Sequence, residues 1–167
     1  MRGISALSQK RGLACGQEIF RKSEKIFMNL IEEHNKKYQF FADITGVAMK
    51  VYNKYRPGLL ESAYEAAMKY LLELDGYKVG RQVDLPIFWE DVQLDQHYRM
   101  DLVVNDDIIV ELKAIQFVSD EQRKQLKNYL NITHCPYGML INFSPDRLYS
   151  EWYERYFDGK IERVKLF

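Results

Sequence analysis

The sequence predicts an α/β fold: a single domain with a mixed β-sheet flanked by helices. Three observations lead to this prediction. Apolar residues recur at helical spacing through the first half of the chain, up to about Leu74. Short extended segments follow from Tyr77, and one further helix interrupts them after Ser119. Helices, then strands, then a helix and more strands is an order typical of a sheet with helices packed on it.

The expected helices have recognisable patterns and ends. Residues 18–41 carry apolar side chains at helical spacing and are expected to form a helix that precedes the domain. Residues 43–55 form one apolar stripe, which predicts the first helix of the domain. Residues 59–74 are rich in good helix formers and predict the second. The third is expected over 119–130, because Ser119 is followed three residues later by Gln122, a capping-box pair.

The expected strands are short and are bounded by turn residues. Pro86 separates two extended segments, and a polar connection is expected over residues 90–96. A β-hairpin is predicted where two apolar runs bracket the polar turn at residues 105–107. The predicted strands are 78–85, 87–89, 98–104, 108–113, 137–143, 148–157 and 161–167, although a short helix followed by a strand also fits the last two segments.

Charge and cysteine content narrow the function. The 24 basic and 24 acidic residues give a net charge of zero, whereas a strong non-specific nucleic-acid binder has a basic excess. A local basic groove is compatible with that average. Two cysteines, Cys15 and Cys135, do not form a zinc or iron–sulfur pattern, so we expect neither cofactor. The same low count predicts no disulfide framework and fits a reducing cytoplasm, where we expect the protein to be located.

The N-terminal residues 1–40 are expected to be an extension, partly helical or poorly ordered, and residues 41–167 are expected to form the folded domain. No apolar run approaches the length that spans a membrane, and no apolar stretch near the N-terminus is long enough for a signal peptide. We therefore expect no membrane partner. The oligomeric state is not determined by the sequence, and a homodimer is compatible with it.

The predicted hairpin carries the most informative residues. Side chains alternate along a strand, so Glu111 and Lys113 point to the same side, while Val110 and Leu112 point to the other. Asp101 lies on the neighbouring strand, which brings two carboxylates and one ammonium within reach of one point. Carboxylate oxygens suit Mg²⁺ or Mn²⁺, and a lysine suits a phosphate or a water molecule beside the metal. The arrangement can hydrolyse a phosphodiester.

Each candidate residue also has an ordinary explanation. Asp101 can mark the exposed end of a strand, and Glu111 with Lys113 can be a structural ion pair, because a buried carboxylate needs a cation. Glu61 can be a solvated helix residue. Four further residues, which are Gln125, Tyr129, Lys124 and Lys127, can be ordinary core or surface positions of the third helix, and His97 can be an exposed loop histidine.

Five segments in this order resemble the GxxExxY protein family, which looks like a branch of the PD-(D/E)XK nuclease superfamily. The resemblance covers about residues 43–148. Met100-Asp101 stands where the superfamily has Pro-Asp, and two cysteines stand where some relatives have the four that hold an iron–sulfur cluster. The segments are Gly58-Leu59-Leu60-Glu61-Ser62-Ala63-Tyr64, Tyr98-Arg99-Met100-Asp101, Val110-Glu111-Leu112-Lys113-Ala114, Gln125-Leu126-Lys127-Asn128-Tyr129-Leu130 and Leu140-Ile141-Asn142-Phe143.

The resemblance implies a restriction-endonuclease-like sheet, a divalent metal (Mg²⁺ or Mn²⁺) and a role for each candidate. Asp101, Glu111 and Lys113 are the implied signature residues, and Glu61 is the implied helix-borne acid at the metal. The backbone carbonyl of Leu112 is a plausible further ligand. Gln125 and Tyr129 resemble the Gln-x-x-x-Tyr motif of RecB-like exonucleases, and Lys124 and Lys127 are candidates for phosphate contacts. These roles imply a nuclease that hydrolyses DNA.

Two other functions stay open at this point. The same fold can serve as a non-catalytic module that binds nucleic acid or protein, and zero net charge fits that hypothesis. The polar cluster can also be a metal-free ion-pair network that stabilises the fold.

Overall fold

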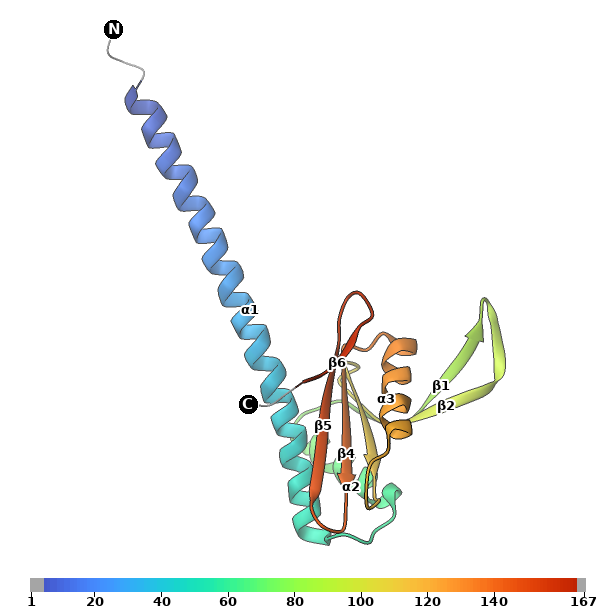
Figure 1. Cartoon of the computed structure of the whole chain (residues 1–167). Coiled ribbons are helices and arrows are strands. Elements are labelled where there is room, and N and C mark those ends of the chain that lie inside the picture. The colour runs from blue at the N-terminus through green and yellow to red at the C-terminus, as the bar shows by residue number, and fades with distance from the viewer. Residues whose placement is uncertain (1–4, 165–167) are drawn as a thin grey trace. The chain divides into compact units, whose positions relative to one another are not determined.

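The computed structural model describes residues 5–164 of the backbone, and the side chains of Lys22 and of residues 24–164. In this part of the chain two helices are followed by three strands, a third helix and three more strands, which is the predicted order of helices and strands (Figure 1). The helices are α1 (Ser5–Tyr55), α2 (Glu61–Leu74) and α3 (Asp120–Thr133). The strands are β1 (Val79–Trp89), β2 (Val92–Val104), β3 (Ile108–Lys113), β4 (Tyr137–Phe143), β5 (Leu148–Arg155) and β6 (Ile161–Val164).

The six strands form one mixed sheet in the order β1-β2-β3-β4-β5-β6. Every neighbouring pair is antiparallel except β3 and β4, which are parallel. Parallel neighbours need a crossover connection, and α3 lies in that connection. The prediction of a mixed sheet flanked by helices is confirmed.

Within residues 43–164, helices cover both faces of the sheet. On one face α3 packs against β3 and β4, where Leu126 and Leu130 are buried (Figure 1). Gly138 of β4 allows this approach, because an added Cβ would lie 2.9 Å from a Leu130 methyl carbon. On the other face α2 packs against β1, β2 and β3. The ring of Tyr64 on α2 stacks on Phe143 of β4, with centroids 4.1 Å apart.

The helix α1 corrects one prediction. Two separate helices were expected over residues 18–41 and 43–55, but α1 continues through both. No glycine or proline lies at the expected break, so nothing there interrupts the backbone ladder. By contacts, the chain divides into Met1–Ala42 and Asp43–Phe167. No helix of the described residues is long and apolar enough to cross a membrane.

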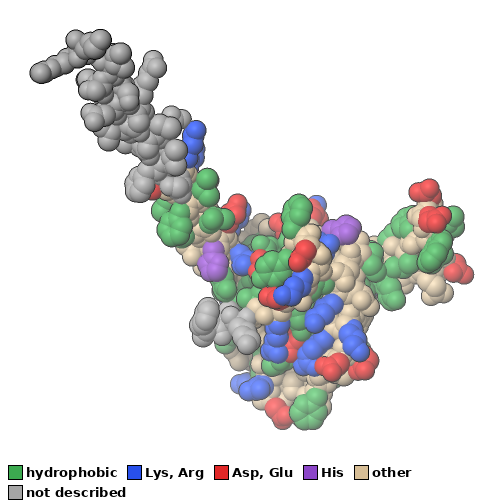
Figure 2. Space-filling view, turned by 45° about the horizontal axis from the view of Figure 1, so that its top comes forward, with side chains coloured by type: hydrophobic (Ala, Val, Ile, Leu, Met, Phe, Trp, Pro, Cys, Tyr) green, Lys and Arg blue, Asp and Glu red, His purple; other side chains and the backbone are tan. Residues whose placement is uncertain are grey.

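The hairpin of β1 and β2 is longer than predicted. Residues 90–96 were expected to be a polar connection, but β2 already begins at Val92, because Glu90 adopts a left-handed φ of 51° and turns the chain within two residues. The hairpin tip projects from the sheet and exposes Phe88 and Trp89 beside acidic side chains (Figures 1 and 2).

The closing strands agree with the prediction of strands rather than a helix. Strand β5 ends at Arg155, two residues before the expected end, because residues 156–159 turn the chain towards β6. The predicted last strand extended to Phe167, and residues 165–167 lie outside the described part of the chain.

Candidate active site

Glu111 and Lys113 lie on β3, which is flanked by β2 and β4 in the sheet. Their side chains are on the same side of the strand, as the alternation predicts, and Lys113 Nζ donates a hydrogen bond to Glu111 Oε1 over 2.6 Å. Glu111 is 2% exposed. A carboxylate buried to this degree needs a cation, and Lys113 supplies one positive charge.

Asp101 is fixed where the pairing of β2 with β3 ends. The last backbone pair joins Leu102 to Val110, so Asp101 is the next residue of β2 and Glu111 the next of β3. The Asp101 side chain continues the contact, because its Oδ2 accepts a hydrogen bond from the backbone N–H of Leu112 over 2.8 Å. The carboxylates of Asp101 and Glu111 interact electrostatically, so both predicted acids lie in the same place.

Glu61 approaches the same strand end from α2. It is the first residue of that helix, and its Oε1 accepts a hydrogen bond from the backbone N–H of Ala114 over 3.0 Å. Ala114 directly follows Lys113, so Glu61 holds the chain at the point where β3 ends. Its charge acts on both Asp101 and Glu111. Leu112 contributes its amide to Asp101, and a role for its carbonyl as a ligand stays a prediction.

The protonation of this cluster follows from burial. Burial, and after it the charge of the Asp101 carboxylate, raise the pKa of Glu111 to about 7 against the lowering effect of Lys113. The pKa of Asp101 is also raised, mainly by burial, although the Leu112 amide opposes this. For Lys113 burial lowers the pKa, but the carboxylates of Glu111, Asp101 and Glu61 together raise it. The cluster contains more buried negative charge than one ammonium compensates.

This shortage of positive charge fits a divalent cation. Glu111 Oε2 is buried and has no hydrogen-bond partner. An unsatisfied carboxylate oxygen beside a second carboxylate is a donor set that Mg²⁺ or Mn²⁺ accepts. The three acids do not form a ready-made cage, however: among the described residues no group of three or more His, Cys, Asp or Glu side chains is placed to hold a metal. The Leu112 amide, Lys113 and the Ala114 amide each occupy one oxygen of these acids instead.

Gln125 and Tyr129 lie together on α3. Gln125 Nε2 donates to the Tyr129 hydroxyl over 2.6 Å, and this hydroxyl lies 3.5 Å from the backbone oxygen of Arg99. Burial raises the pKa of Tyr129, and the charges of Glu111 and Asp101 act on it. The phenol therefore belongs to the same electrostatic environment as the carboxylates.

The two lysines of α3 point to different places. Lys124 lines a pocket of about 240 Å³ together with Gln125 and Tyr129. Lys127 instead lies over the ring of Tyr153, with Nζ 5.5 Å from the centroid. His97 is exposed, as its ordinary explanation predicts, but it lies on strand β2 and pairs with Pro86 rather than lying in a loop.

Three residues behind Asp101 were not predicted. Glu65 is buried on α2, and its Oε2 accepts hydrogen bonds from Arg81 over 3.0 Å and from Gln82 over 2.8 Å. The same Gln82 amide lies 3.4 Å from Asp101 Oδ1. Gln82 has a left-handed φ of 52°, a rare conformation for a strand residue. The sequence signal was present, since Glu65 follows Tyr64 on the apolar face of α2, but nothing in it identifies the partners.

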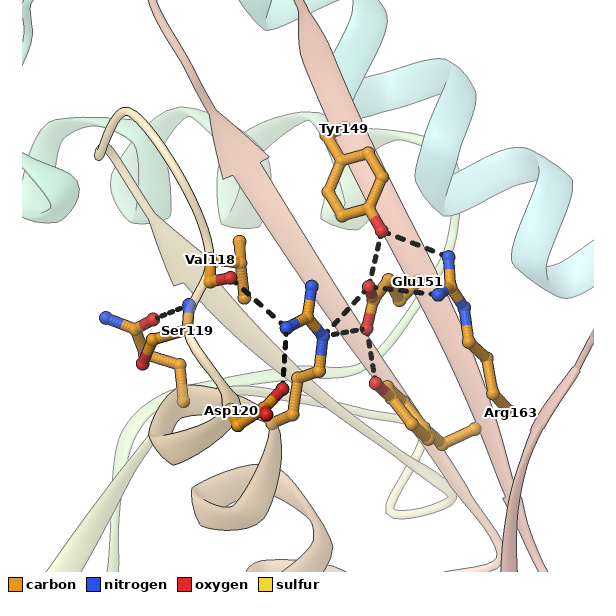
Figure 3. Close-up of polar contacts among 9 residues, drawn as sticks. Val118, Ser119, Asp120, Tyr149, Glu151 and Arg163 are labelled. Carbon is orange, nitrogen blue, oxygen red and sulfur yellow. Dashed lines mark hydrogen bonds and ion pairs between the residues drawn. The ribbon is translucent and has the colours of Figure 1, made fainter.

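A second buried carboxylate was also missed. Glu151 of β5 is 1% exposed and accepts hydrogen bonds from Arg123, Tyr149 and Tyr153, with Arg163 as a further ion-pair partner (Figure 3). The bond from Arg123 Nε is 3.0 Å long. These partners together lower the pKa of Glu151, although burial raises it. This carboxylate is therefore fully compensated by protein groups.

The mixed six-stranded sheet with helices on both faces is of the restriction-endonuclease-like type. Residues 38–155, more than half of the chain, match the sequence profile of the PD-(D/E)XK nuclease superfamily. The chain therefore belongs to this superfamily. No curated protein matches the chain.

One similar solved structure carries the description "Crystal structure of SSO0001". It shares 16% sequence identity with the chain at a TM-score of 0.41, and the match covers 70% of this chain and 60% of that one. The chain thus spans less than two thirds of the length of that protein.

Proposed function

We propose that the protein is a metal-dependent nuclease that hydrolyses DNA phosphodiester bonds, and that it belongs to the GxxExxY branch of the superfamily. One observation carries the proposal: Glu111 is buried beside Asp101 with one oxygen unpartnered and a pKa raised to about 7. Such an arrangement is unfavourable for the fold alone, because unsatisfied buried charge costs stability. A function as a cation site explains why the arrangement is kept.

Asp101 and Glu111 are the residues that would hold the cation, with Glu61 beside them. A bound Mg²⁺ or Mn²⁺ would supply Lewis-acid activation of the phosphodiester and of water. Lys113, at the end of β3, would face the phosphate, where its ammonium would stabilise the negative charge that develops in the transition state. Gln125 and Tyr129, which are bonded to each other, are proposed to position the substrate strand, with Lys124 and Lys127 as phosphate contacts.

Cleavage of labelled DNA with Mg²⁺ or Mn²⁺ tests this proposal. Lys113→Ala is expected to lower the cleavage rate by about 100-fold or more, because charge stabilisation in the transition state is lost. Lys78→Ala is the matched control: Lys78 is exposed, pairs with Asp106, and precedes β1 at the opposite end of the sheet. Equal cleavage rates for the wild type and Lys113→Ala would contradict the proposal.

The alternative is a non-catalytic module that keeps the nuclease fold. It is favoured by the finding that each of the three acids already has a protein partner and that the described residues contain no ready-made group of three metal ligands. Calorimetric titration with Mn²⁺ distinguishes the two functions. The nuclease predicts binding that Asp101→Ala abolishes, and the module predicts no binding at millimolar metal.

A further inference from the structure

A pocket of about 400 Å³ lies beside the candidate active site and is not used by the proposed mechanism. It is formed by the loop after β3 and the loop after β4, with the first turn of α3 as a third wall. Lys113 of β3 pairs in register with Asn142 of β4, and Asn142 lines the pocket. The pocket therefore begins next to the residue that is proposed to face the phosphate.

Hydrogen bonds from β4 and from the loop after it hold the loop after β3 in place. Asn142 is 2% exposed, and its side-chain amide bonds both the N–H and the C=O of Ile115, over 3.0 and 2.9 Å. Gln116 Nε2 donates to Asp146 over 2.8 Å, which joins the two loops. Phe117 follows directly and lines the pocket while 79% of it is exposed. An exposed aromatic ring on a fixed loop is a stacking surface.

Arg123 forms a fixed cationic wall. Its Nε bonds Glu151, and its Nη1 bonds the Val118 carbonyl and Asp120, so the guanidinium is held by three residues (Figure 3). Its Nη2 takes part in none of these bonds. Because these bonds already fix the Arg123 side chain in the free protein, binding of a ligand at Nη2 costs little side-chain entropy.

The charge of the pocket favours an anion. Two guanidinium groups, Arg123 and Arg147, and one carboxylate, Asp146, line it, which gives a net charge of +1 on a protein whose total is zero. Asp146 is already bonded by Gln116, whereas Arg147 is exposed and makes no hydrogen bond or ion pair with the described residues. A flat aromatic surface beside guanidinium groups suits a nucleotide whose base is unpaired, since the base stacks and the phosphate meets the arginines.

We infer that this pocket binds an unpaired nucleotide of the DNA strand, adjacent to the bond that is cleaved. The inference rests on the proposed function and adds a substrate class to it: DNA with a single-stranded segment rather than a blunt duplex. A base inside a duplex is paired with its partner and stacked on both faces, so neither face is free to lie on the ring of Phe117.

Fluorescence anisotropy tests the inference without cleavage. The probes are a fluorescein-labelled 12-nucleotide oligo-dT and a labelled blunt 12-base-pair duplex, titrated with the full chain in EDTA. The wild type is expected to prefer the single strand. Phe117→Ala is expected to weaken single-strand binding about tenfold and to leave duplex binding unchanged, because one stacked base is lost. Phe117→Trp is expected to keep the wild-type affinity.

Phe157→Ala is the matched control, since Phe157 is also an exposed aromatic residue but lies in the turn between β5 and β6. Arg147→Ala is expected to reduce the salt dependence of single-strand binding by about one phosphate contact. Equal effects of Phe117→Ala and Phe157→Ala, or equal affinity of the wild type for both probes, would overturn the inference.

The two proposals fail in different ways. A wild-type protein that binds the single strand through Phe117 but does not cleave DNA contradicts the nuclease and leaves the pocket standing. A protein whose cleavage depends on Lys113, but whose binding is unaffected by Phe117→Ala, contradicts the pocket and leaves the nuclease standing.

Discussion

Two buried carboxylates, on β3 and β5, are separated by strand β4 and have opposite environments. Leu140 of β4 pairs with Glu111 on one side and with Glu151 on the other, so the three residues form one row. Glu151 has two arginines and two tyrosines, and its pKa is lowered. Glu111 has one lysine and an unpartnered oxygen, and its pKa is raised to about 7.

Under the proposed function, this difference separates a carboxylate that stabilises the fold from one that binds a cation. A protein that only needed to bury an acid would compensate it, as it does at Glu151. Glu111 is incompletely compensated, and the nearby Asp101 carboxylate makes its ionised form still less favourable. Perturbed acids of this kind concentrate at functional sites. Four predictions test whether the two glutamates really differ in this way.

The largest expected effect is on stability. Glu151→Ala should lower the free energy of unfolding by about 3–5 kcal/mol, because Arg123 and Tyr153 lose their common buried partner. Glu111→Ala should cost far less or stabilise the apo protein, because it relieves repulsion with Asp101. Urea denaturation of both variants, with exposed Glu90→Ala as the control, measures this difference. A larger loss for Glu111→Ala would instead support a structural ion-pair network there.

The second prediction concerns pH. Folded Glu111 keeps its proton up to about pH 7, whereas the unfolded chain releases it near the ordinary value of 4.5. The free energy of unfolding should therefore fall as pH rises between these values, by about 3 kcal/mol from this group. Glu151 has the opposite sign: its contribution is present above pH 4.5 and is lost as pH falls through its lowered pKa. Denaturation at pH 3–8 should show that Glu111→Gln removes only the decline towards neutral pH.

The third prediction concerns metal binding. A cation must compete with the proton on Glu111, so the apparent affinity for Mn²⁺ should be about tenfold weaker at pH 6 than at pH 8. Calorimetry at both pH values measures the change. Glu111→Gln should abolish this dependence along with most of the affinity, whereas Tyr149→Phe, near the other carboxylate, should leave both unchanged. A pH-independent affinity in the wild type would remove Glu111 from the ligand set.

The smallest expected effect comes from one hydroxyl. Tyr149 donates to Glu151, so Tyr149→Phe should cost about 1–2 kcal/mol, the value of a hydrogen bond to a charged group. Tyr156→Phe is a suitable control, because that ring is exposed in the turn after β5. Thermal unfolding monitors both variants. A change no larger than that of the control would mean that Arg123, Arg163 and Tyr153 compensate Glu151 without Tyr149.

The sequence predicted those parts of the molecule that depend on local patterns. Alternation along β3 placed Glu111 and Lys113 on one side, and the Ser119 and Gln122 pair correctly marked the start of α3. The prediction divided the long helix α1 near residue 42, although no glycine or proline lies there to end the helix.

Partners that come from distant segments were beyond such patterns. Tyr149, Glu151 and Tyr153 alternate on β5, and the alternation is legible in the sequence. That Arg123 and Arg163 would meet them depends on how α3 and β6 pack. The hydrogen bonds of Asp101 and Glu61 with the backbone amides of Leu112 and Ala114 were also beyond local patterns, because each joins distant segments of the chain.

The parallel pairing of β3 with β4 has a consequence for the growing polypeptide. Asp101, Glu111 and Lys113 leave the ribosome together, but the strand that borders them on the far side begins only at Tyr137. Asn142, which fixes the chain just after Lys113, is made later still. Synthesis of the acids and the lysine thus precedes the framework that orients them, and a truncated product ending before β4 should be inert toward nucleic acid.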